Sequence, residues 1–435
     1  MASNRIVSTW RTYRSVGIVY RIGIAFVLGS LLGLAVGETA TVLQPIGDLF
    51  VRLLTMLIVP IVVFTLLMGV RQLTPSTLGK LGGQVVALYA VTSAVAVAVG
   101  LAVSNAIQPG SRGLESLLAE AEPQSAEAPS ATEVVLNIVP TNPLGAMAEG
   151  SVLPTIFFVV VFGLALALVQ EETDDPAISS GIETFFDLAE AGAEAMFKVV
   201  WGVMEFGVLG VFALMASVFG AAGVDAIVPF ALLIVTMLVA AVVHIGVVYL
   251  GGFVVGILGQ SPFSFLSGAR EAMVTALSIR SSSGTLPVTM SDADENLGVA
   301  ERVYGFTLPL GATINMDGTA MYQGVAAIFA ANVVGVNLTL ADQFAVVSVA
   351  VLASIGTAGV PGSGLIMLTL VLTQLGLPLE IVGVVAGVDP ILDRIRTMVN
   401  VTGDLAVTTA VAKWNGAVDF TTGVWSDGVR SSLAD

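Results

Sequence analysis

The sequence predicts an all-α protein that crosses a membrane several times. Of its 435 residues, 56% are hydrophobic and only 11% are charged, whereas a soluble globular chain carries about 25% charged residues. The apolar residues lie in long runs, and one bilayer-spanning helix needs about 20 of them. The length therefore converts into roughly eight to ten hydrophobic spans, and the lipid bilayer is the first expected partner.

The charge balance excludes several classes of protein. The formal net charge is -16, and the only lysines are Lys80, Lys198 and Lys413. So acidic a surface argues against nucleic acid as a partner and favours a high-salt habitat, where screening relieves self-repulsion. The chain has no cysteine, which excludes disulfides and thiol chemistry. Its one histidine, His244, cannot form a multi-histidine metal site and is expected to be structural.

The distribution of arginine predicts how the chain is oriented in a cell membrane. Arg5, Arg11, Arg14 and Arg21 precede or open the first apolar run, whereas the long segment 109–132 is acidic. Cytoplasmic loops carry the excess of basic residues. We therefore expect a multi-pass protein with both termini in the cytoplasm and this acidic segment outside. No cleavable signal peptide is evident.

The first 260 residues contain six apolar runs. They lie near 20–37, 43–70, 82–107, 133–170, 184–220 and 226–259. Three prolines, Pro140, Pro143 and Pro154, interrupt the fourth run, so we expect it to form several pieces. The fifth run is too long for one straight crossing, and we expect it to be broken as well.

The pattern changes after residue 260. Two segments rich in Ser, Gly, Thr and Pro, 280–287 and 354–364, each lead into a span that carries polar groups. Such interruptions at corresponding positions of two halves indicate a transporter site built from repeats. Non-helical backbone survives at membrane depth only where protein buries it or where it lines water. We therefore predict two re-entrant hairpins, the alternative being ordinary loops outside the bilayer.

The last apolar segment carries a polar stripe. At about 100° per residue, one helix face holds six polar side chains. These are Asp389, Asp393, Arg396, Thr397, Asn400 and Asp404. A polar stripe on a membrane helix is costly, so it must face a cavity or a partner. The alternative is a salt-bridge cluster that only holds helices together.

The residue types in this stripe suit an acidic amino acid. Arg396 can form a bidentate fork with a substrate carboxylate, and Asp393, one turn away, can pair with an ammonium group. Together they fit a molecule with two carboxylates and one amine, which describes aspartate or glutamate. Asn315 and Asp317 in the broken span near 299–331, together with Asp404, supply hard oxygen ligands that suit sodium.

Four segments resemble the signature segments of the glutamate transporter family, the sodium-coupled dicarboxylate and amino-acid symporters. They are 280–290, 311–324, 353–370 and 389–413, and the resemblance is closest to archaeal aspartate transporters. It implies eight transmembrane helices and two re-entrant helical hairpins, arranged as inverted repeats in a homotrimer. One domain would move like an elevator across the membrane relative to a static scaffold.

The resemblance also implies a division of the chain. Scaffold helices would occupy 1–81 and 133–225, the transport domain 82–108 (third helix) and 226–413 (sixth helix to eighth helix with both hairpins), the acidic extracellular loop 109–132, and the cytoplasmic tail 414–435.

Carried over residue by residue, the resemblance implies a substrate pocket and three sodium sites. Arg396 would bind the side-chain carboxylate and Asp393 the amino group, while Ser282 and Asn400 would hold the α-carboxylate. The remaining pocket residues would be Arg280, Thr319, Val360, Gly364 and Thr397. The first sodium site would comprise Gly311, Asn315, Asn400 and Asp404; the second, carbonyls of Thr313, Ser354, Ile355 and Thr357; the third, Tyr89, Thr92, Ser93, Asn315 and Asp317.

Two departures from the family pattern bear on mechanism. Gln323 stands where proton-coupled animal members carry a glutamate, so we expect sodium coupling without protons. Arg280 matches archaeal members and Arg394 matches animal members, whereas members usually carry only one of the two.

The same residues bear on several other functions. Neutral amino-acid carriers lack the arginine at 396, and C4-dicarboxylate carriers lack the aspartate at 393, so their joint presence favours L-aspartate or L-glutamate. An intramembrane hydrolase using one of the serines 281–283 would need a positioned base, and no acid lies near His244 in sequence to orient it. A pure anion channel would not need three cation sites. We expect a symporter and not an enzyme.

Overall fold

The computed structural model describes the chain except for residues 1–15, 72–74, 112–135, 137–138, 356–361 and 427–435. Within the described residues the elements are helical, and the one strand-like feature there is an isolated bridge between Val299 and Val418. The predicted all-α class is confirmed. The acidic segment 109–132 falls almost wholly outside the described residues.

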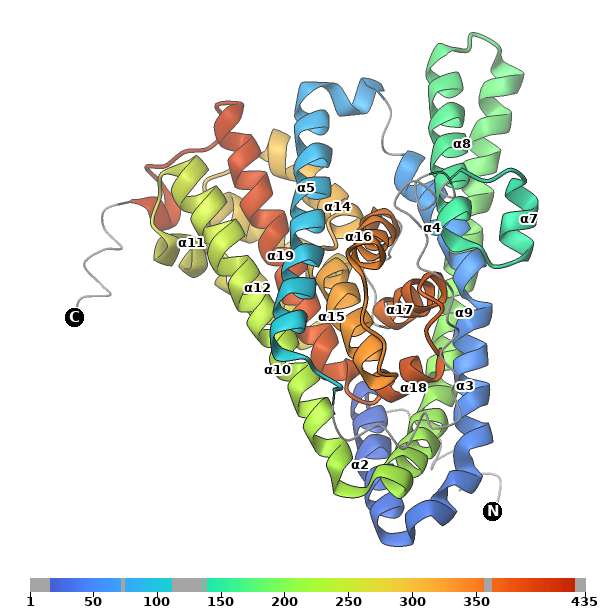
Figure 1. Cartoon of the computed structure of the whole chain (residues 1–435). Helices are drawn as coiled ribbons and strands as arrows, with labels where there is room; N and C mark the ends of the chain where they lie inside the picture. The colour runs from blue at the N-terminus through green and yellow to red at the C-terminus, as the bar shows by residue number, and fades with distance from the viewer. Residues whose placement is uncertain (1–15, 72–74, 112–135, 137–138, 356–361, 427–435) are drawn as a thin grey trace, which may run out of the picture.

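One group of helices comes from the first half of the chain. It comprises α2 (Ile18–Val36), η1 (Gly37–Leu43), α3 (Gln44–Met56), α4 (Ile58–Arg71), α7 (Pro143–Ala148), α8 (Val152–Glu172) and α9 (Pro176–Ala222). The long helix α9 packs along α2, α3 and α4 (Figure 1). An ion pair joins α2 to α9, with Arg21 Nη1 lying 2.5 Å from Glu205 Oε2.

Two expectations about this group have different outcomes. The run at 133–170 is divided as predicted, because α7 and α8 are separate helices. The run at 184–220 is not broken, so that prediction was wrong: it lies within the single 47-residue helix α9. No proline follows Pro176 in this helix. Its glycines at 192, 207 and 210 leave room for the rings of Phe64 and Phe50, so close packing does not require a break.

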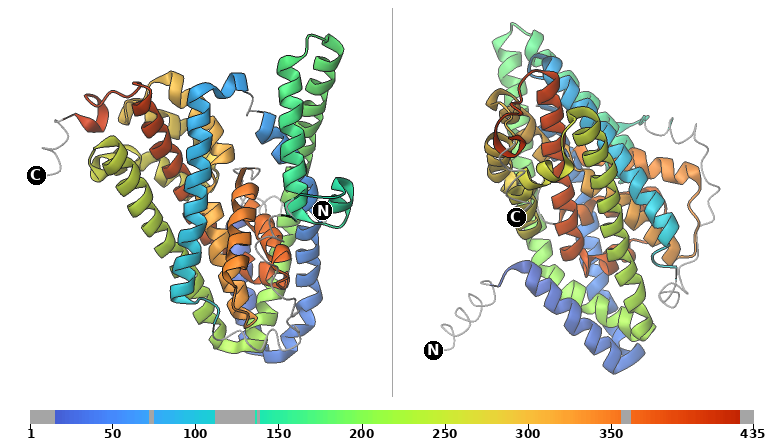
Figure 2. Two further views of the ribbon diagram at one scale, coloured as in Figure 1. Left: turned by 45° about the horizontal axis from the view of Figure 1, so that its top comes forward. Right: turned by 90° about the vertical axis from the view of Figure 1, so that its left-hand side faces the viewer.

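A second group surrounds the C-terminal helix. It comprises α5 (Pro75–Ile107), α10 (Ile227–His244), η4 (Ile245–Leu258), α11 (Pro262–Gly268), α12 (Arg270–Ile279), α13 (Ser282–Ser291), α14 (Glu301–Ile314), α15 (Asp317–Val333) and α19 (Asp389–Trp414). Helix α19 packs against α5, α10, η4, α12, α14 and α15 (Figures 1 and 2). It is therefore buried on nearly every side, which allows charged residues on it to be held inside the protein.

Each of the two predicted hairpins is a pair of packed helices in the described residues. Helices α12 and α13 pack together and turn at Arg280 and Ser281, so the segment predicted as the first hairpin is a helix–turn–helix. Helices α16 (Leu340–Ile355) and α17 (Ser363–Gln374) also pack together, but the tip at 356–361 lies outside the described residues. Helix α18 (Glu380–Ala386) then leads into α19.

Four described stretches are long and apolar enough to cross a membrane. They are Tyr20–Met68, Leu81–Ile107, Pro154–Glu172 and Pro176–Leu258, and the last is long enough for more than one crossing. All of them precede residue 260. The apolar helices beyond it are shorter, such as Leu340–Leu352 and Ser363–Gln374. The change of pattern that the sequence shows at this point therefore corresponds to a change from long helices to interrupted ones.

The base of the first hairpin is held by a buried carboxylate. Asp292, in η5 (Asp292–Asn296), accepts hydrogen bonds from the Ala272 amide at 2.8 Å and from the Asn296 side chain at 2.9 Å. Burial raises the pKa of the Asp292 carboxyl, while both hydrogen bonds act in the opposite direction. Close by, Trp425 in η6 (Gly423–Trp425) donates to the Leu297 carbonyl at 2.9 Å. The chain after α19 is thereby attached to the hairpin base.

We expect Asp292→Ala to lower the free energy of unfolding by about 1–3 kcal/mol, because it leaves the buried Ala272 amide without an acceptor. Thermal unfolding of the purified protein measures this. The matched control is Asp294→Ala, since Asp294 is exposed in the same segment. Equal melting temperatures for the two variants would contradict the assigned role.

Candidate functional site

The N-terminal half of α19 holds a balanced cluster of buried charges. Arg396, only 1% exposed, lies with Nη1 2.9 Å from Asp389 Oδ1 and with Nη2 2.7 Å from Asp393 Oδ1. Its guanidinium stacks over the ring of Tyr322 at 4.3 Å, and Arg280 Nη1 lies 3.4 Å from Asp393 Oδ2. Two arginines thus face two aspartates, and such pairing makes burial of the charges tolerable.

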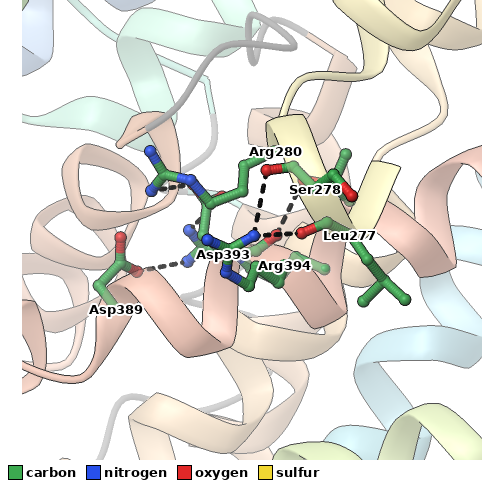
Figure 3. A network of polar contacts seen from close by, with 8 residues as sticks. Leu277, Ser278, Arg280, Asp389, Asp393 and Arg394 are labelled. Atoms are coloured by element: carbon green, nitrogen blue, oxygen red, sulfur yellow. Dashed lines mark hydrogen bonds and ion pairs between the residues drawn. The ribbon is translucent and has the colours of Figure 1, made fainter. Parts of the chain in front are cut away.

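The tip of the first hairpin is fixed to α19 by another arginine, as Figure 3 shows. Arg394 Nη1 donates to the carbonyls of Leu277 at 2.5 Å and Ser278 at 3.1 Å. These belong to the last turn of α12, whose carbonyls lack partners within the helix. Arg280 ends that helix in the left-handed conformation, with φ 57°, and Ser281 caps α13 by accepting from the Gly284 amide.

We expect Arg394→Gln to loosen this tip, because a neutral side chain gives weaker hydrogen bonds to the two carbonyls. The expected effect is a roughly three- to tenfold higher KM for the transported substrate, as a loss of about 1 kcal/mol would give. Labelling of a cysteine placed at Ser278 should become faster as well. An unchanged labelling rate would show that the tip is held by other contacts.

A second polar cluster surrounds the break between α14 and α15. The chain leaves its helix at Asn315 and Met316. The Asn315 side-chain amide donates to Asp404 Oδ1 at 2.8 Å, and the Asn400 side-chain oxygen accepts from the Gly318 amide at 2.7 Å. At Gly311 any side chain would overlap the Asp404 carboxylate and the Tyr89 hydroxyl. The break therefore brings α5, α14, α15 and α19 together around oxygen atoms.

Asp317 extends this cluster toward α5 and η4. Its Oδ1 accepts from the Ser93 hydroxyl at 2.6 Å and its Oδ2 from the Tyr249 hydroxyl at 2.6 Å. Asp317 and Asp404 are both buried, and within the described part of the chain no lysine or arginine pairs with either. Two buried carboxylates held only by neutral donors favour a bound cation. Their hard oxygen atoms suit sodium.

The structure brings together most of the residues that the sequence predicts for the site. The two clusters contain Arg280, Asp393, Arg396, Tyr89, Ser93, Gly311, Asn315, Asp317, Asn400 and Asp404. Three further predicted residues are buried close to them in the chain: Ser282, Thr319 and Thr397. The hydroxyls of Thr92 and Thr313 bind backbone carbonyls of their own helices. Val360 and Thr357 lie outside the described residues, and the side chains of Ser354 and Ile355 are not described either.

Three site residues were missed by reasoning from the sequence. Tyr322 stacks on Arg396, Tyr249 binds Asp317, and His244 lies with Nε2 3.6 Å from Asp317 Oδ2. No acid lies near His244 in sequence, and the acid beside it in the structure comes from a helix far along the chain. The spacing of His244 and Tyr249 in an otherwise apolar run was the available signal.

A comparison with protein families matches residues 18–414 to the sodium:dicarboxylate symporter family. The chain belongs to this family. It is therefore a membrane transporter and not an enzyme, as its apolar helices and buried charge clusters also indicate. The resemblance read from the four segments of the sequence is confirmed.

Relatives of this chain are named as transporters of acidic compounds. A proton/sodium-glutamate symport protein of Geobacillus stearothermophilus is 34% identical, over 93% of this chain and 96% of its own length. A proton/glutamate-aspartate symporter of Escherichia coli strain K12 is 32% identical, over 92% and 94%. A C4-dicarboxylate transport protein of Rhodospirillum rubrum is 31% identical, over 91% and 88%. These relatives support an acidic substrate.

Proposed function

We propose that this chain is a sodium-coupled symporter that moves L-aspartate or L-glutamate into the cell. The observation that carries the proposal is the pairing of two clusters on one helix. Arg396 and Asp404 are eight residues apart on α19, about 12 Å along its axis at 1.5 Å per residue. The first cluster offers a fork for a carboxylate, and the second offers uncompensated oxygen charge for a cation. Substrate and ion would therefore bind to the same rigid element.

Asp393 favours an amino acid over a plain dicarboxylate. Its carboxylate faces both Arg396 and Arg280, so an ammonium group that binds beside these arginines would find a carboxylate partner. A C4-dicarboxylate is the second candidate, because some relatives carry that name. It brings no amine for Asp393. Between aspartate and glutamate the difference is one methylene, worth about 1–3 kcal/mol in a pocket.

The coupling ion is proposed to be sodium alone, although several relatives are named for protons and sodium together. The Gln323 side chain is a neutral amide that does not titrate. It donates to the Gly364 carbonyl at 3.2 Å, beside the arginine cluster. Among the described residues, the carboxylates beside this cluster are those of Asp389 and Asp393, and both pair with Arg396. The sodium sites are those predicted from the sequence, and the contacts of Asn315, Asp317 and Asp404 support two of them.

For translocation we propose an elevator movement within a homotrimer, as the resemblance implies. The grouping of helices supports this division of labour. Helix α19 and the broken helix pack within the second group, and the long helices α2, α3, α4, α8 and α9 pack among themselves. The proposed moving part would carry both clusters. The proposed scaffold would contain α9, whose length suits an immobile support.

Uptake of radiolabelled L-aspartate into proteoliposomes tests the proposal. Accumulation should require an inward sodium gradient and should be absent with potassium on both sides. Unlabelled glutamate should compete strongly and succinate weakly. A proton gradient without sodium should give no accumulation. Strong competition by succinate would favour the dicarboxylate alternative, and accumulation driven by protons alone would overturn sodium coupling.

A further inference from the structure

The one histidine of the chain is buried beside the cation cluster without a hydrogen bond. His244 is fully inaccessible, and neither ring nitrogen has a hydrogen-bond partner among the described residues. Its Nε2 lies 3.6 Å from Asp317 Oδ2, just beyond hydrogen-bond distance. Buried polar groups are normally satisfied. Burying an imidazole without hydrogen bonds has a desolvation cost that an apolar side chain would avoid, so a role for the ring is expected.

The local backbone directs this histidine toward Asp317. Helix α10 ends at His244, and the π-helical segment η4 follows from Ile245. In a π-helix the hydrogen bonds run between residues five apart, so side chains at this spacing lie nearly one above the other. In an α-helix they would diverge by about 140°. Tyr249 stands five residues after His244, and the two rings meet edge to face with centroids 4.7 Å apart.

The π-helical segment has a matching sequence feature. Gly246, Gly251 and Gly256 recur at the same spacing of five. A Cβ built on Gly251 would lie 3.3 Å from the Gly246 carbonyl, and one on Gly256 would lie 3.3 Å from the Gly251 carbonyl. The glycines thus accommodate the wide turns. π-Helical turns are frequent at functional sites, and this one brings two ring side chains to one carboxylate.

Asp317 consequently has neighbours from three elements. Ser93 from α5 and Tyr249 from η4 each donate to one of its oxygens, while His244 from α10 approaches Oδ2. A movement of about 0.5 Å would bring Nε2–H into hydrogen-bond range. Neutral donors fix the direction of a carboxylate without cancelling its charge. The nearby Asn315 Oδ1 has no partner among the described residues and is free to face a cation.

We infer that His244 is a positioning residue for the cation site at Asp317. It would orient the carboxylate from the end of α10, and the π-helical turn that follows brings Tyr249 to the same oxygen. This inference rests on the proposed sodium coupling. Partners that orient an ion ligand from outside typically affect ion affinity by about 10- to 100-fold when removed.

The test compares His244→Leu with His244→Gln, because a glutamine amide can donate from near the position of Nε2. The half-saturating sodium concentration is measured in two ways, by sodium-dependent thermal stabilisation of the purified protein and by uptake. We expect His244→Leu to raise it about tenfold in both, and His244→Gln to stay within about threefold of wild type. The KM for substrate at saturating sodium should remain unchanged in both variants.

A third variant and a sodium-free measurement separate positioning from packing. Thr236→Val removes a buried hydroxyl that binds only the Leu232 carbonyl of its own helix α10, and it should leave sodium dependence unchanged. Without sodium, His244→Leu should melt at or above the wild-type temperature. The inference is overturned if His244→Leu leaves the half-saturating sodium concentration unchanged. It is also overturned if His244→Leu and His244→Gln raise that concentration equally and both lower the sodium-free melting temperature. A wild-type protein that shows no sodium dependence overturns the proposed function and this inference together.

Discussion

Arg396→Cys is expected to abolish accumulation of acidic amino acids. The arginine is fully buried and holds two carboxylates, Asp389 and Asp393, at 2.9 and 2.7 Å. Its loss removes the bidentate fork for the substrate and leaves both acids without their shared partner. Truncating one member of a buried charge pair costs about 2–5 kcal/mol, so initial uptake of L-aspartate should fall by at least about 30-fold. A small neutral amino acid is expected to be transported instead.

The measurement is uptake of labelled L-aspartate and of labelled L-serine by the same proteoliposomes. Arg52→Cys is the matched control, because Arg52 is exposed on α3 and should leave both rates as in wild type. Folding is checked by sodium-dependent thermal stabilisation, which depends on the Asp317 and Asp404 cluster and should persist. Retention of L-aspartate uptake in a folded Arg396→Cys protein would contradict the role assigned to the arginine.

The parts of the site that lie within one helix could be predicted from the sequence. The six polar residues from Asp389 to Asp404 follow the helical period, and nothing but a helix places them on one face. Their burial follows from the cost of charge in a membrane. The break at Asn315 was predictable for a similar reason, since Gly and Asn interrupt an apolar helix and free its backbone groups. The structure agrees on both points.

Contacts between helices distant in sequence could not be predicted in this way. The stacking of Tyr322 on Arg396 joins α15 to α19, and the approach of His244 to Asp317 joins α10 to α15. Neither pairing leaves a periodic signal, because each depends on how whole helices pack. The carbonyl contacts of Arg394 depend likewise on the end of α12 lying against α19. Arg280 and Arg394, of which family members usually carry only one, therefore contact different groups.

The continuity of α9 could not be predicted from the length of its apolar run. The length of the run at 184–220 indicated a break, yet α9 is continuous over 47 residues. Length alone gives the amount of apolar sequence and not the tilt or overhang of a helix. The deciding features are local: the absence of an internal proline and the placement of glycines opposite the large rings of α3 and α4. Prolines in the run at 133–170 gave the correct division for the same reason.

Asp404→Asn is expected to uncouple transport from sodium while leaving the fold intact. The carboxylate accepts a hydrogen bond from the Asn315 side chain at 2.8 Å, and an asparagine oxygen can accept the same bond. Only the charge is lost. Unit charges 4 Å apart attract by about 4 kcal/mol at an effective dielectric constant of 20. If half of this survives desolvation of the ion, about 2 kcal/mol, the half-saturating sodium concentration rises about 30-fold.

Two measurements distinguish this loss of charge from a loss of structure. Sodium-dependent stabilisation should shrink or vanish, while the melting temperature without sodium should stay equal or rise, because one of two buried like charges is gone. Asp419→Asn is the control: Asp419 lies beyond α19, where hydrogen bonds from Thr421 lower the pKa of its carboxyl, and its loss should not change sodium dependence. A lowered sodium-free melting temperature in Asp404→Asn with an unaltered response to sodium would assign Asp404 to folding alone, and the cation would then have to be held by Asp317 and its neighbours.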